Sequence, residues 1–421
     1  MVFRWLEAAE PDVFWLDAGA DARTGWSFIG RGLVADLPSE VRLDVAPSDT
    51  AMPPFSGGWV GWLDYESGAR AAGAPVVESA TEGGAWLRAT HVVAFDHEEG
   101  RMWVLADPDE LDGWADIVAA APADVLTVVE PESDVAPLIA DARHDPDEYA
   151  GLIQRCRALI RAGIAYQLCL TTRFSVPGDH DAVGVYLRLR AATPAHHGGF
   201  VRIGGGALLS ASPEQFLHAE GGIIRTRPIK GTRPRSADPV QDAALAAELA
   251  VNPKERAENV MIVDLMRNDL SRVCEPGTIR VDGLWVVESY PAVHQLVSTV
   301  TGTAAAGTTI GAVLDAAFPA GSMTGAPKLS AMTRLHDLEG GPRGVYAGCF
   351  GYVGVDGALD LAMVIRSIVI DADGAVIGAG GGITWGSDPA AEVAEVATKA
   401  RAPLAALGAV LPVRWGSDIL N

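Results

Sequence analysis

The sequence predicts an α+β fold, and three patterns support this prediction. Up to about residue 135 the chain consists of short segments with alternating apolar residues and many aromatic side chains, which is typical of β-strands. Residues 145–163 have the apolar spacing of a helix, and strands and helices then alternate until a final helix that begins near Asp388. With 421 residues, 49% of them hydrophobic, the chain can bury a large core.

Turn and capping residues set the boundaries of the expected elements. Strands are expected over 14–19, 25–30, 57–66, 90–98, 101–110 and 164–176. Asp145 and Pro146 predict a helix start and Gly163 its end, while Asp388 and Pro389 predict the N-cap and first residue of the terminal helix. The Ala/Pro/Asp/Val stretch 121–137 predicts a linker between an N-terminal segment, residues 1–135, and one interwoven unit, residues 136–421.

Charge and cysteine usage exclude several classes of protein. The 54 acidic residues against 32 basic ones give a net charge of -22, which argues against nucleic acid and membrane partners. The longest uncharged stretch, 289–314, is interrupted by Pro and His, and the N-terminus turns acidic too early for a signal peptide. The four cysteines have no CxxC spacing, so neither disulfides nor a zinc site is expected. We therefore expect a cytoplasmic protein.

Lysine is rare, and Lys230 has a sequence context that suits chemistry. The chain has only four lysines, at 230, 254, 328 and 399. Unlike arginine, lysine can lose its proton and act as a nucleophile. Glu214 precedes Lys230 by sixteen positions with β-like residues between them, so adjacent strands could carry both into one cavity. The flanking arginines, at 225, 227, 233 and 235, would disfavour protonation of Lys230. A solvated basic cluster at a strand end is the alternative.

Two predicted helices each present a pair of carboxylates on one face. Glu255 and Glu258 are three residues apart, as are Glu392 and Glu395, with Lys399 one turn further. Like charges at this spacing repel, and a divalent cation would reverse the effect. An all-oxygen set of this kind suits Mg²⁺. The alternative is a solvated acidic surface.

Further along the chain, several motifs could hold a carboxylate. FPAGSMTGAPK lacks the spacing of a phosphate loop, but backbone donors around Ser322 could bind an anion. Tyr346, Arg366 and the glycine run that ends at Gly382 would supply an arginine fork beside backbone amides. No cysteine stands in a Gly-flanked elbow, so amide nitrogen chemistry would need another chain or free ammonia.

Taken in order, the motifs resemble those of the chorismate-utilising enzymes. The segments are WSFIG, GGWVGWLDYE, SPEQF, PIKGT, KERAENVMIVDLMRNDL, VHQLVSTV, FPAGSMTGAPK, RGVYAG, DLAMVIR and SDPAAEVAEVATKA. The likeness covers nearly the whole chain and is strongest over 148–401. Lys230 favours component I of aminodeoxychorismate synthase, because the similar anthranilate synthases have Ala in its place. Gln167 stands where isochorismate and salicylate synthases have a water-activating lysine, which argues against water as the nucleophile.

The resemblance implies two stacked, mostly antiparallel β-sheets flanked by helices, with chorismate and Mg²⁺ in a cleft. Glu258 and Glu395 would ligate Mg²⁺, and Glu255 and Glu392 would support it through waters. Lys230 would attack C2 of chorismate while Glu214 protonates the departing C4 hydroxyl. Other positions that match substrate-binding residues of the family are Gly231, Thr232, Ser322, Tyr346, Arg366, Gly380, Gly381, Gly382 and Lys399.

The implied activity is that of a transferase. Ammonia from a glutamine amidotransferase subunit would attack C4 and give 4-amino-4-deoxychorismate, for 4-aminobenzoate and folate synthesis. Because no lyase segment follows Asn421, a separate enzyme would release pyruvate. The alternatives are an anthranilate synthase component I and a non-catalytic chorismate-binding scaffold.

Three positions depart from the family pattern. Gln295 stands where the family usually has His, and His294 beside it could substitute for that imidazole. Ala18 replaces a Ser of the tryptophan-binding pocket that the N-terminal segment could contain. Thr193-Pro194 replaces the more usual Asn-Pro.

Overall fold

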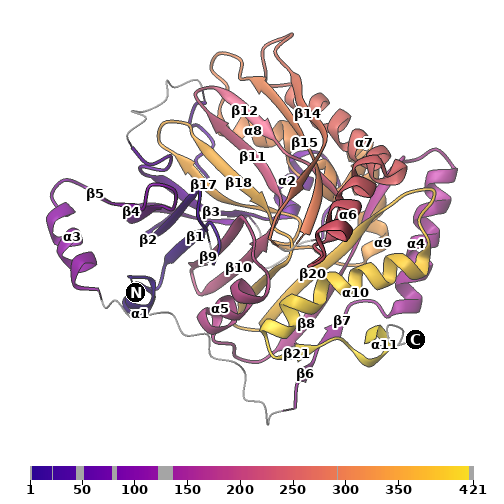
Figure 1. Ribbon diagram of the computed structural model, residues 1–421, viewed down its shortest axis with the longest axis horizontal. Helices are drawn as coiled ribbons and strands as arrows, with labels where there is room; N and C mark the ends of the chain where they lie inside the picture. Colours follow the sequence, from indigo (N-terminus) through magenta and orange to yellow (C-terminus); the bar gives the residue numbers. More distant parts are fainter. Residues whose placement is uncertain are drawn as a thin grey trace.

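The computed structural model describes residues 2–20, 22–43, 52–77, 83–121, 136–291 and 293–416. The expected linker, 121–137, lies almost entirely outside the described residues. The N-terminal strands are part of the same sheets as the later ones, because β1 (Val13–Asp17) pairs with β9 (His197–Ile203) and β3 (Gly58–Leu63) pairs with β17 (Cys349–Gly354). Figure 1 shows these early strands beside the later ones.

Two antiparallel sheets form the centre of the molecule. The first runs, in hydrogen-bonded order, through β8 (Gln167–Pro177), β20 (Gly374–Ile383), β19 (Ser367–Asp371), β10 (Gly206–Ser212), β9, β1, β2 (Trp26–Ala35), β4 (Ala85–Asp96) and β5 (Arg101–Ala106). The second runs through β3, β17, β18 (Leu359–Met363), β11 (Gln215–Glu220), β12 (Ile223–Thr226), β15 (Val293–Thr303) and β14 (Arg280–Ser289), and β13 (Ile229–Pro234) also pairs with β15. Strand β4 joins the sheets, since it pairs with both β2 and β3. The short strands β7 (Asp141–Ala142) and β16 (Gly325–Ala326) pair with β8, and β6 (Leu138–Ile139) pairs with β21 (Ala409–Val410).

The period-two pattern of each strand separates an inner core from an outer one. In β1, Phe14 belongs to the apolar cluster between the sheets, whereas Trp15 belongs to the cluster on the outer face of the first sheet. In β17, Phe350 faces inward and Cys349 faces the outer cluster of the second sheet. This alternation is what two stacked sheets require, and it confirms the predicted fold class.

Helices cover the outer faces of both sheets, as Figure 1 shows. On the first sheet lie α4 (Pro146–Arg161), α5 (Ala182–Ala192), α9 (Lys328–Glu339) and α10 (Pro389–Ala406). Near the second lie α2 (Tyr65–Ala71), α6 (Pro239–Val251), α7 (Pro253–Leu270) and α8 (Ile310–Ala317). Shorter or peripheral helices are α1 (Val2–Ala9), α3 (Leu111–Ala120), α11 (Val413–Gly416) and the 3₁₀ turn η1 (Gly321–Met323). Within the described ranges, the helices are too short or too polar to cross a bilayer.

The predicted helix signals are confirmed at both long helices. Asp145 caps α4 in a capping box with Glu148, and the helix ends at Arg161, just before Gly163 takes a φ of 74°. Asp388 caps α10, accepting a hydrogen bond from the backbone N–H of Ala391 at 2.9 Å. Because α10 carries two of the predicted site carboxylates, its cap helps to position them.

Removing the α10 cap should measurably destabilise the fold. We expect Asp388→Ala to lower the free energy of unfolding by about 1 kcal/mol, because the N–H group it caps loses its acceptor. Asp388→Asn is the matched control, since asparagine caps equally well without the charge. Urea denaturation compares the two variants, and equal stability of both would show that the cap contributes nothing.

Candidate active site

A cavity of about 520 Å³ opens where β13 and β20 approach α7 and α10. Its walls include every residue predicted as a site residue, and those residues come from distant parts of the chain: Glu214, Lys230, Gly231, Thr232, Glu255, Glu258, Ser322, Tyr346, Arg366, Gly380, Gly381, Gly382, Glu392, Glu395 and Lys399. The volume is within the range of pockets that bind small organic molecules. The structure therefore brings the predicted residues together, while their individual roles stay predictions.

Glu214 and Lys230 reach the cavity by a different route from the one expected. Glu214 lies in the link between β10 and β11, and Lys230 lies on β13, which pairs with β15 rather than with β11. The prediction of two adjacent strands is therefore wrong, although both side chains still line one cavity. Burial raises the pKa of Glu214 above its ordinary value, opposed by the charge of Lys230, a hydrogen bond from Ser322 and the charge of Lys399. A buried carboxyl of this kind keeps its proton to a higher pH than an exposed glutamate does.

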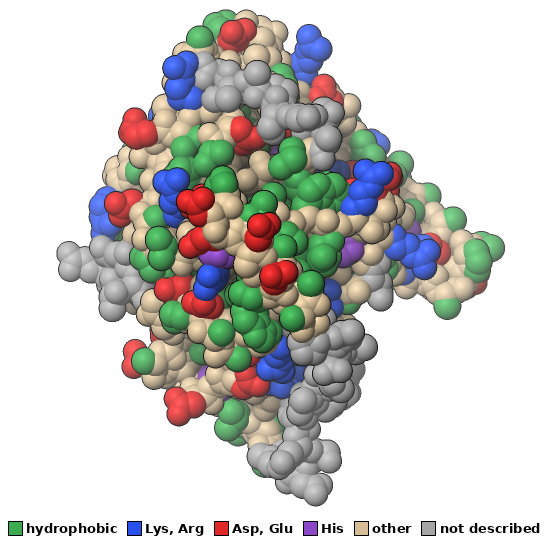
Figure 2. All heavy atoms as spheres, turned by 90° about the vertical axis from the view of Figure 1, so that its left-hand side faces the viewer, with side chains coloured by type: hydrophobic (Ala, Val, Ile, Leu, Met, Phe, Trp, Pro, Cys, Tyr) green, Lys and Arg blue, Asp and Glu red, His purple; other side chains and the backbone are tan. Residues whose placement is uncertain are grey.

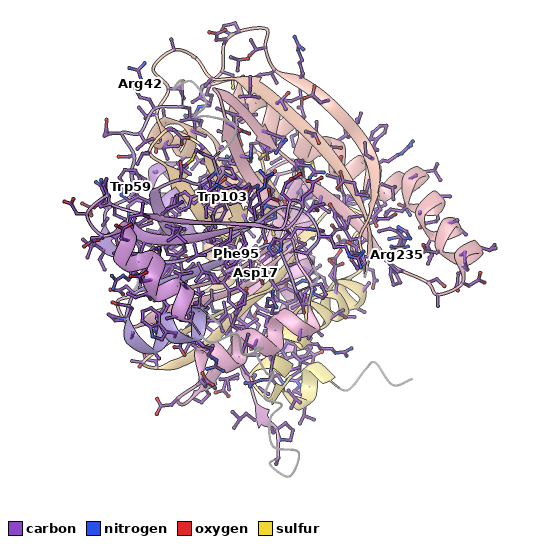
Figure 3. All side chains as sticks on the ribbon, turned by 60° about the vertical axis from the view of Figure 1, so that its left-hand side comes forward. Asp17, Arg42, Trp59, Phe95, Trp103 and Arg235 are labelled. Atoms are coloured by element: carbon purple, nitrogen blue, oxygen red, sulfur yellow. The ribbon has the colours of Figure 1, made fainter. Side chains whose placement is uncertain are left out.

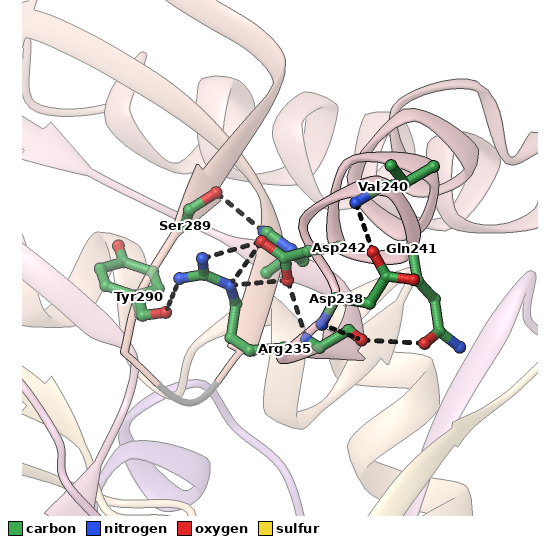
Figure 4. Close-up of polar contacts among 9 residues, drawn as sticks. Arg235, Asp238, Val240, Gln241, Asp242, Ser289 and Tyr290 are labelled. Carbon is green, nitrogen blue, oxygen red and sulfur yellow. Dashed lines mark hydrogen bonds and ion pairs between the residues drawn. The ribbon is translucent and has the colours of Figure 1, made fainter.

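The arginines near Lys230 in the sequence do not surround it in space. Arg227 pairs with Glu288, and Arg235 donates to the Asp242 carboxylate at 2.8 Å and to the carbonyl of Tyr290 at 2.7 Å (Figure 4). Of the four, Arg233 alone is among the described residues that line the cavity. The structure therefore does not place the four arginines as a cluster around Lys230, which corrects that expectation.

Arg233 is compensated as well, and the nearer environment of Lys230 is acidic. The Arg233 guanidinium lies 2.7 Å from Glu248 and 3.5 Å from Glu255. The charge of Lys230, in turn, acts on Glu214 and Glu258, where it partly opposes the burial that raises the pKa of each. The chemistry of Lys230 must therefore be understood among carboxylates rather than among cations.

The four predicted metal-ligating carboxylates face the same cavity from α7 and α10. Burial raises the pKa of Glu258, opposed by Lys230 and Lys254 and reinforced by Glu255 and Glu392. Burial likewise raises the pKa of Glu392. For Glu395 burial also acts upward, but the charge and hydrogen bond of Lys399, whose Nζ lies 2.6 Å from the carboxylate, bring the pKa below its ordinary value.

The donor set fits a hard divalent cation in its chemistry. All four side chains offer carboxylate oxygens, which Mg²⁺ prefers, and their mutual repulsion in a half-buried cavity favours a bound cation. Lysines accompany two of them: Nζ of the largely exposed Lys254 lies 3.9 Å from Glu258, and Nζ of Lys399 lies 2.6 Å from Glu395. In the part of the chain that the structure describes, no three His, Cys, Asp or Glu side chains already form a tight metal-binding cluster.

Glycines line the face of β20 that borders the cavity, so side chains from other elements can lie close to the backbone of this strand. A Cβ added to Gly382 would lie 2.8 Å from Nε2 of Gln167 and 3.5 Å from Nζ of Lys230, so a larger residue would push into the predicted nucleophile. Lys399 donates to the carbonyl of Gly380 at 2.8 Å, which anchors its side chain over the strand. Arg366, on the link before β19, has a φ of 52° and lines the same wall.

Lys254 and Cys169 line the cavity but were not assigned to the site from the sequence. Gln167 lies next to Gly382 without being among the described residues that line the cavity, and it was not assigned either. Gln167 is fully buried, and neither polar atom of its side chain has a hydrogen-bond partner. A polar residue in the apolar run AYQLCL was the available signal. Lys254 could have been found from its i,i+4 spacing to Glu258. Cys169 gave no signal, because a buried cysteine in a strand is ordinary.

Gln295, one of the departures from the family pattern, and His294, its candidate substitute, lie on opposite faces of β15. Gln295 lines the cavity, whereas His294 points away, where it contacts Ser289 at 2.8 Å and Asp242 at 3.0 Å. The imidazole of His294 therefore does not replace the family histidine.

A second, far smaller cavity of about 60 Å³ lies beside Asp17 in the N-terminal part. Aromatic side chains, among them Trp26 and Phe350, line it, and Asp17 is held by Arg190. Figure 3 shows Asp17 in the interior, far from Arg235. This is where a tryptophan pocket was expected, and its use stays a prediction.

The sequence pattern of the chorismate binding enzyme family matches residues 22–405. The chain belongs to this family. It is 43% identical over 386 residues to an aminodeoxychorismate synthase of Streptomyces pristinaespiralis, covering 88% of this chain and 53% of that protein. It is 41% identical over 394 residues to an anthranilate synthase component 1 of Streptomyces coelicolor, covering 88% of this chain and 76% of that one.

A solved structure shows the same architecture. The anthranilate synthase component I of Streptococcus pneumoniae superposes with a TM-score of 0.78 at 27% identity, covering 92% of this chain and 93% of that one. The chain spans about half the length of the Streptomyces aminodeoxychorismate synthases that it matches. The family and the fold are therefore established, and the reaction has to be argued from the site.

Proposed function

We propose that this chain aminates chorismate at C4 and forms 4-amino-4-deoxychorismate, with ammonia supplied by a glutamine amidotransferase partner. The observation that carries the proposal is one cavity lined by Lys230, Glu214 and two carboxylate-bearing helices. A primary amine, a buried acid and an acidic face for a cation are the groups that this substitution needs. The product would serve 4-aminobenzoate and folate synthesis.

The substitution would proceed in two halves that balance. In its unprotonated form, the Nζ of Lys230 forms a bond to C2, both conjugated ring double bonds shift, and the C4–O bond breaks with a proton from Glu214, which releases water. Ammonia then forms a bond to C4, both double bonds shift back, the C2–N bond breaks to regenerate the lysine, and a proton from the new amine returns to Glu214. The net change is the exchange of a hydroxyl for an amine.

The remaining residues would hold the substrate and a cation. Glu258 and Glu395 would bind Mg²⁺, with Glu255 and Glu392 supporting it through waters, and the cation would supply positive charge toward a substrate carboxylate. Arg366 and Tyr346 would bind the second carboxylate, beside the backbone of Gly380, Gly381 and Gly382. The positive charge of Arg366 and of the cation would allow an anionic substrate to bind to a chain whose net charge is -22. On the face shown in Figure 2, basic side chains are scattered among acidic ones.

The raised pKa of Glu214 predicts the pH dependence of the reaction. As the acid, Glu214 acts only while protonated, so kcat/KM at a fixed concentration of free ammonia should fall as pH rises through its raised pKa. In Glu214→Gln this basic limb should disappear together with most of the rate. A Glu214→Gln profile that retains the wild-type limb would show that another group is the acid.

Anthranilate synthesis is the second candidate, and a specific finding favours it. The Streptomyces coelicolor relative named anthranilate synthase component 1 is 41% identical to this chain, and the matched region covers 76% of that relative. Against it stands Lys230 in the cavity, where the resembling anthranilate synthases have Ala. The two reactions differ in product, because anthranilate is fluorescent and its formation releases pyruvate.

A product assay tests the proposed function. The purified chain is incubated with chorismate, an ammonium salt and Mg²⁺, with and without an aminodeoxychorismate lyase, and the products are identified by mass. We expect 4-amino-4-deoxychorismate alone and 4-aminobenzoate once the lyase is added. Anthranilate without the lyase would establish the second candidate, and unchanged chorismate would indicate a non-catalytic chorismate-binding protein.

A further inference from the structure

Arg343 is a completely buried cation that lies beneath the cavity without lining it. Its side chain is 1% exposed and pairs with Glu339, with Nε 2.8 Å from one carboxylate oxygen and Nη2 2.7 Å from the other. The guanidinium also stacks on the ring of Tyr65, 4.2 Å from its centroid. A buried ion pair offers little net stability over apolar packing, so its other contacts indicate what it does here.

Those contacts join two segments of the cavity wall. Nη1 of Arg343 donates to the carbonyl of Met323 at 2.6 Å, and Nη2 donates to the carbonyl of Cys169 at 2.8 Å. Met323 ends η1 and Cys169 lies on β8, and both residues line the cavity. One planar fork thus links the carbonyl at the end of η1 to β8, in addition to the backbone hydrogen bond that the N–H of Cys169 donates to the carbonyl of Thr324 at 2.8 Å.

The fork is itself held rigidly. The Glu339 oxygen nearer to Nη2 also accepts the backbone N–H of Thr171 at 2.9 Å, so Glu339 is tied to β8 as well. The backbone N–H groups of Arg343 and Gly344 donate to Glu66 at 2.7 and 2.9 Å. Neither end of the Arg343–Glu339 pair can shift without breaking buried hydrogen bonds.

Ser322 directly precedes Met323, so the contact of Arg343 with the Met323 carbonyl also affects the position of Ser322 in the cavity wall. Ser322 and Glu214, the predicted acid, line the same cavity, and the Ser322 side chain acts to lower the pKa of Glu214 against the upward effect of burial. We propose that Arg343 is a positioning residue: by holding the carbonyls of Met323 and Cys169, it fixes η1 and thereby aims the Ser322 hydroxyl at Glu214. This inference rests on the proposed function only in so far as Glu214 acts as the acid.

A double-mutant cycle tests whether Arg343 acts through Ser322. Arg343→Lys keeps the charge but loses the fork that reaches two carbonyls at once. We expect Arg343→Lys to lower kcat about tenfold with the KM for chorismate little changed, since misplacement of one group by about 1 Å costs up to ~10²-fold. In combination with Ser322→Ala it should add almost nothing to the loss that Ser322→Ala causes alone. Additive losses would overturn the proposal.

The matched control is another buried ion pair in the same part of the fold. Lys328 lies 2.8 Å from Asp269, and neither residue lines the cavity among the residues the structure describes. Asp269→Asn should destabilise the protein, yet its effect on kcat should add independently to that of Ser322→Ala. If Arg343→Lys does not accumulate as folded protein, Glu339→Gln carries the same expectation, because it removes the charge that orients the fork.

A second readout does not depend on turnover. Lys230, Ser322 and Lys399 all act on Glu214 and lower its pKa, so loss of the Ser322 hydrogen bond should raise that pKa. Titration of ¹³C-carboxyl-labelled glutamate by NMR, with the signal assigned by Glu214→Gln, should show the same upward shift in Arg343→Lys as in Ser322→Ala. An unshifted Glu214 in Arg343→Lys would overturn the proposal. If the wild-type protein consumes no chorismate, the proposed function fails, and this titration alone decides the role of Arg343.

Discussion

Lys230→Ala is expected to abolish amination of chorismate, with a loss of at least about 10³-fold in kcat, because the step that displaces the C4 hydroxyl loses its nucleophile. The methyl side chain cannot form the bond to C2, and no other primary amine is assigned to that task. Quantification of 4-amino-4-deoxychorismate by mass gives the rate. Chorismate binding in the presence of Mg²⁺, followed by calorimetry, should survive, because the other walls of the cavity are unchanged.

Lys230→Arg is the matched control for this prediction. Arginine keeps the positive charge beside Glu214 and Glu258 but stays protonated, so it cannot act as a nucleophile. If the lysine acts covalently, both variants should be inactive. An active Lys230→Arg protein beside an inactive Lys230→Ala protein would show that only the charge matters, and wild-type rates in both would exclude any role of the lysine in amination.

Removal of the two predicted magnesium ligands is expected to have the next largest effect. Glu258→Gln combined with Glu395→Gln should lower kcat/KM by about 10²-fold or more at ordinary Mg²⁺ concentrations, because the cation that would hold the substrate is bound less tightly. The Mg²⁺ concentration that gives half-maximal rate should rise correspondingly. Direct calorimetric titration of Mg²⁺ into each protein measures the binding apart from turnover.

Glu248→Gln controls for the removal of a negative charge near the site. Glu248 pairs with Arg233, 2.7 Å away, and is not among the described residues that line the cavity. The Mg²⁺ dependence of the Glu248→Gln protein should equal that of the wild-type protein. If the double variant of Glu258 and Glu395 also keeps wild-type Mg²⁺ binding, those carboxylates do not hold the cation.

The sequence predicted what local rules determine. Caps at Asp145 and Asp388 mark helix starts because a short polar side chain satisfies N–H groups a few residues away. The pairs Glu255/Glu258 and Glu392/Glu395 share faces because helical geometry fixes that spacing. The order of the motifs predicted the two stacked sheets and the set of residues in the site. Those residues are far apart in the chain, and the resemblance to the family, rather than any contact visible in the sequence, indicated that they belong together.

What the sequence could not show depends on long-range pairing. Arg227 and Arg235 lie within a few positions of Lys230, yet their partners Glu288 and Asp242 come from other elements, so local charge gave the wrong surroundings for the lysine. Likewise, nothing near Arg343 in the chain indicates that its side chain reaches the carbonyls of Met323 and Cys169. Only the packing of β8, η1 and α9 brings these groups together.

Mapping of a covalent adduct tests the central claim most directly. The protein is mixed with chorismate and Mg²⁺ in the absence of ammonia, quenched rapidly, digested and analysed by peptide mass spectrometry. We expect an added mass equal to chorismate less one water on the peptide that contains Lys230, and its disappearance when ammonium salt is included. A preparation that turns over chorismate with ammonia, yet shows no modification at Lys230 or shows it at a different residue, would contradict the account.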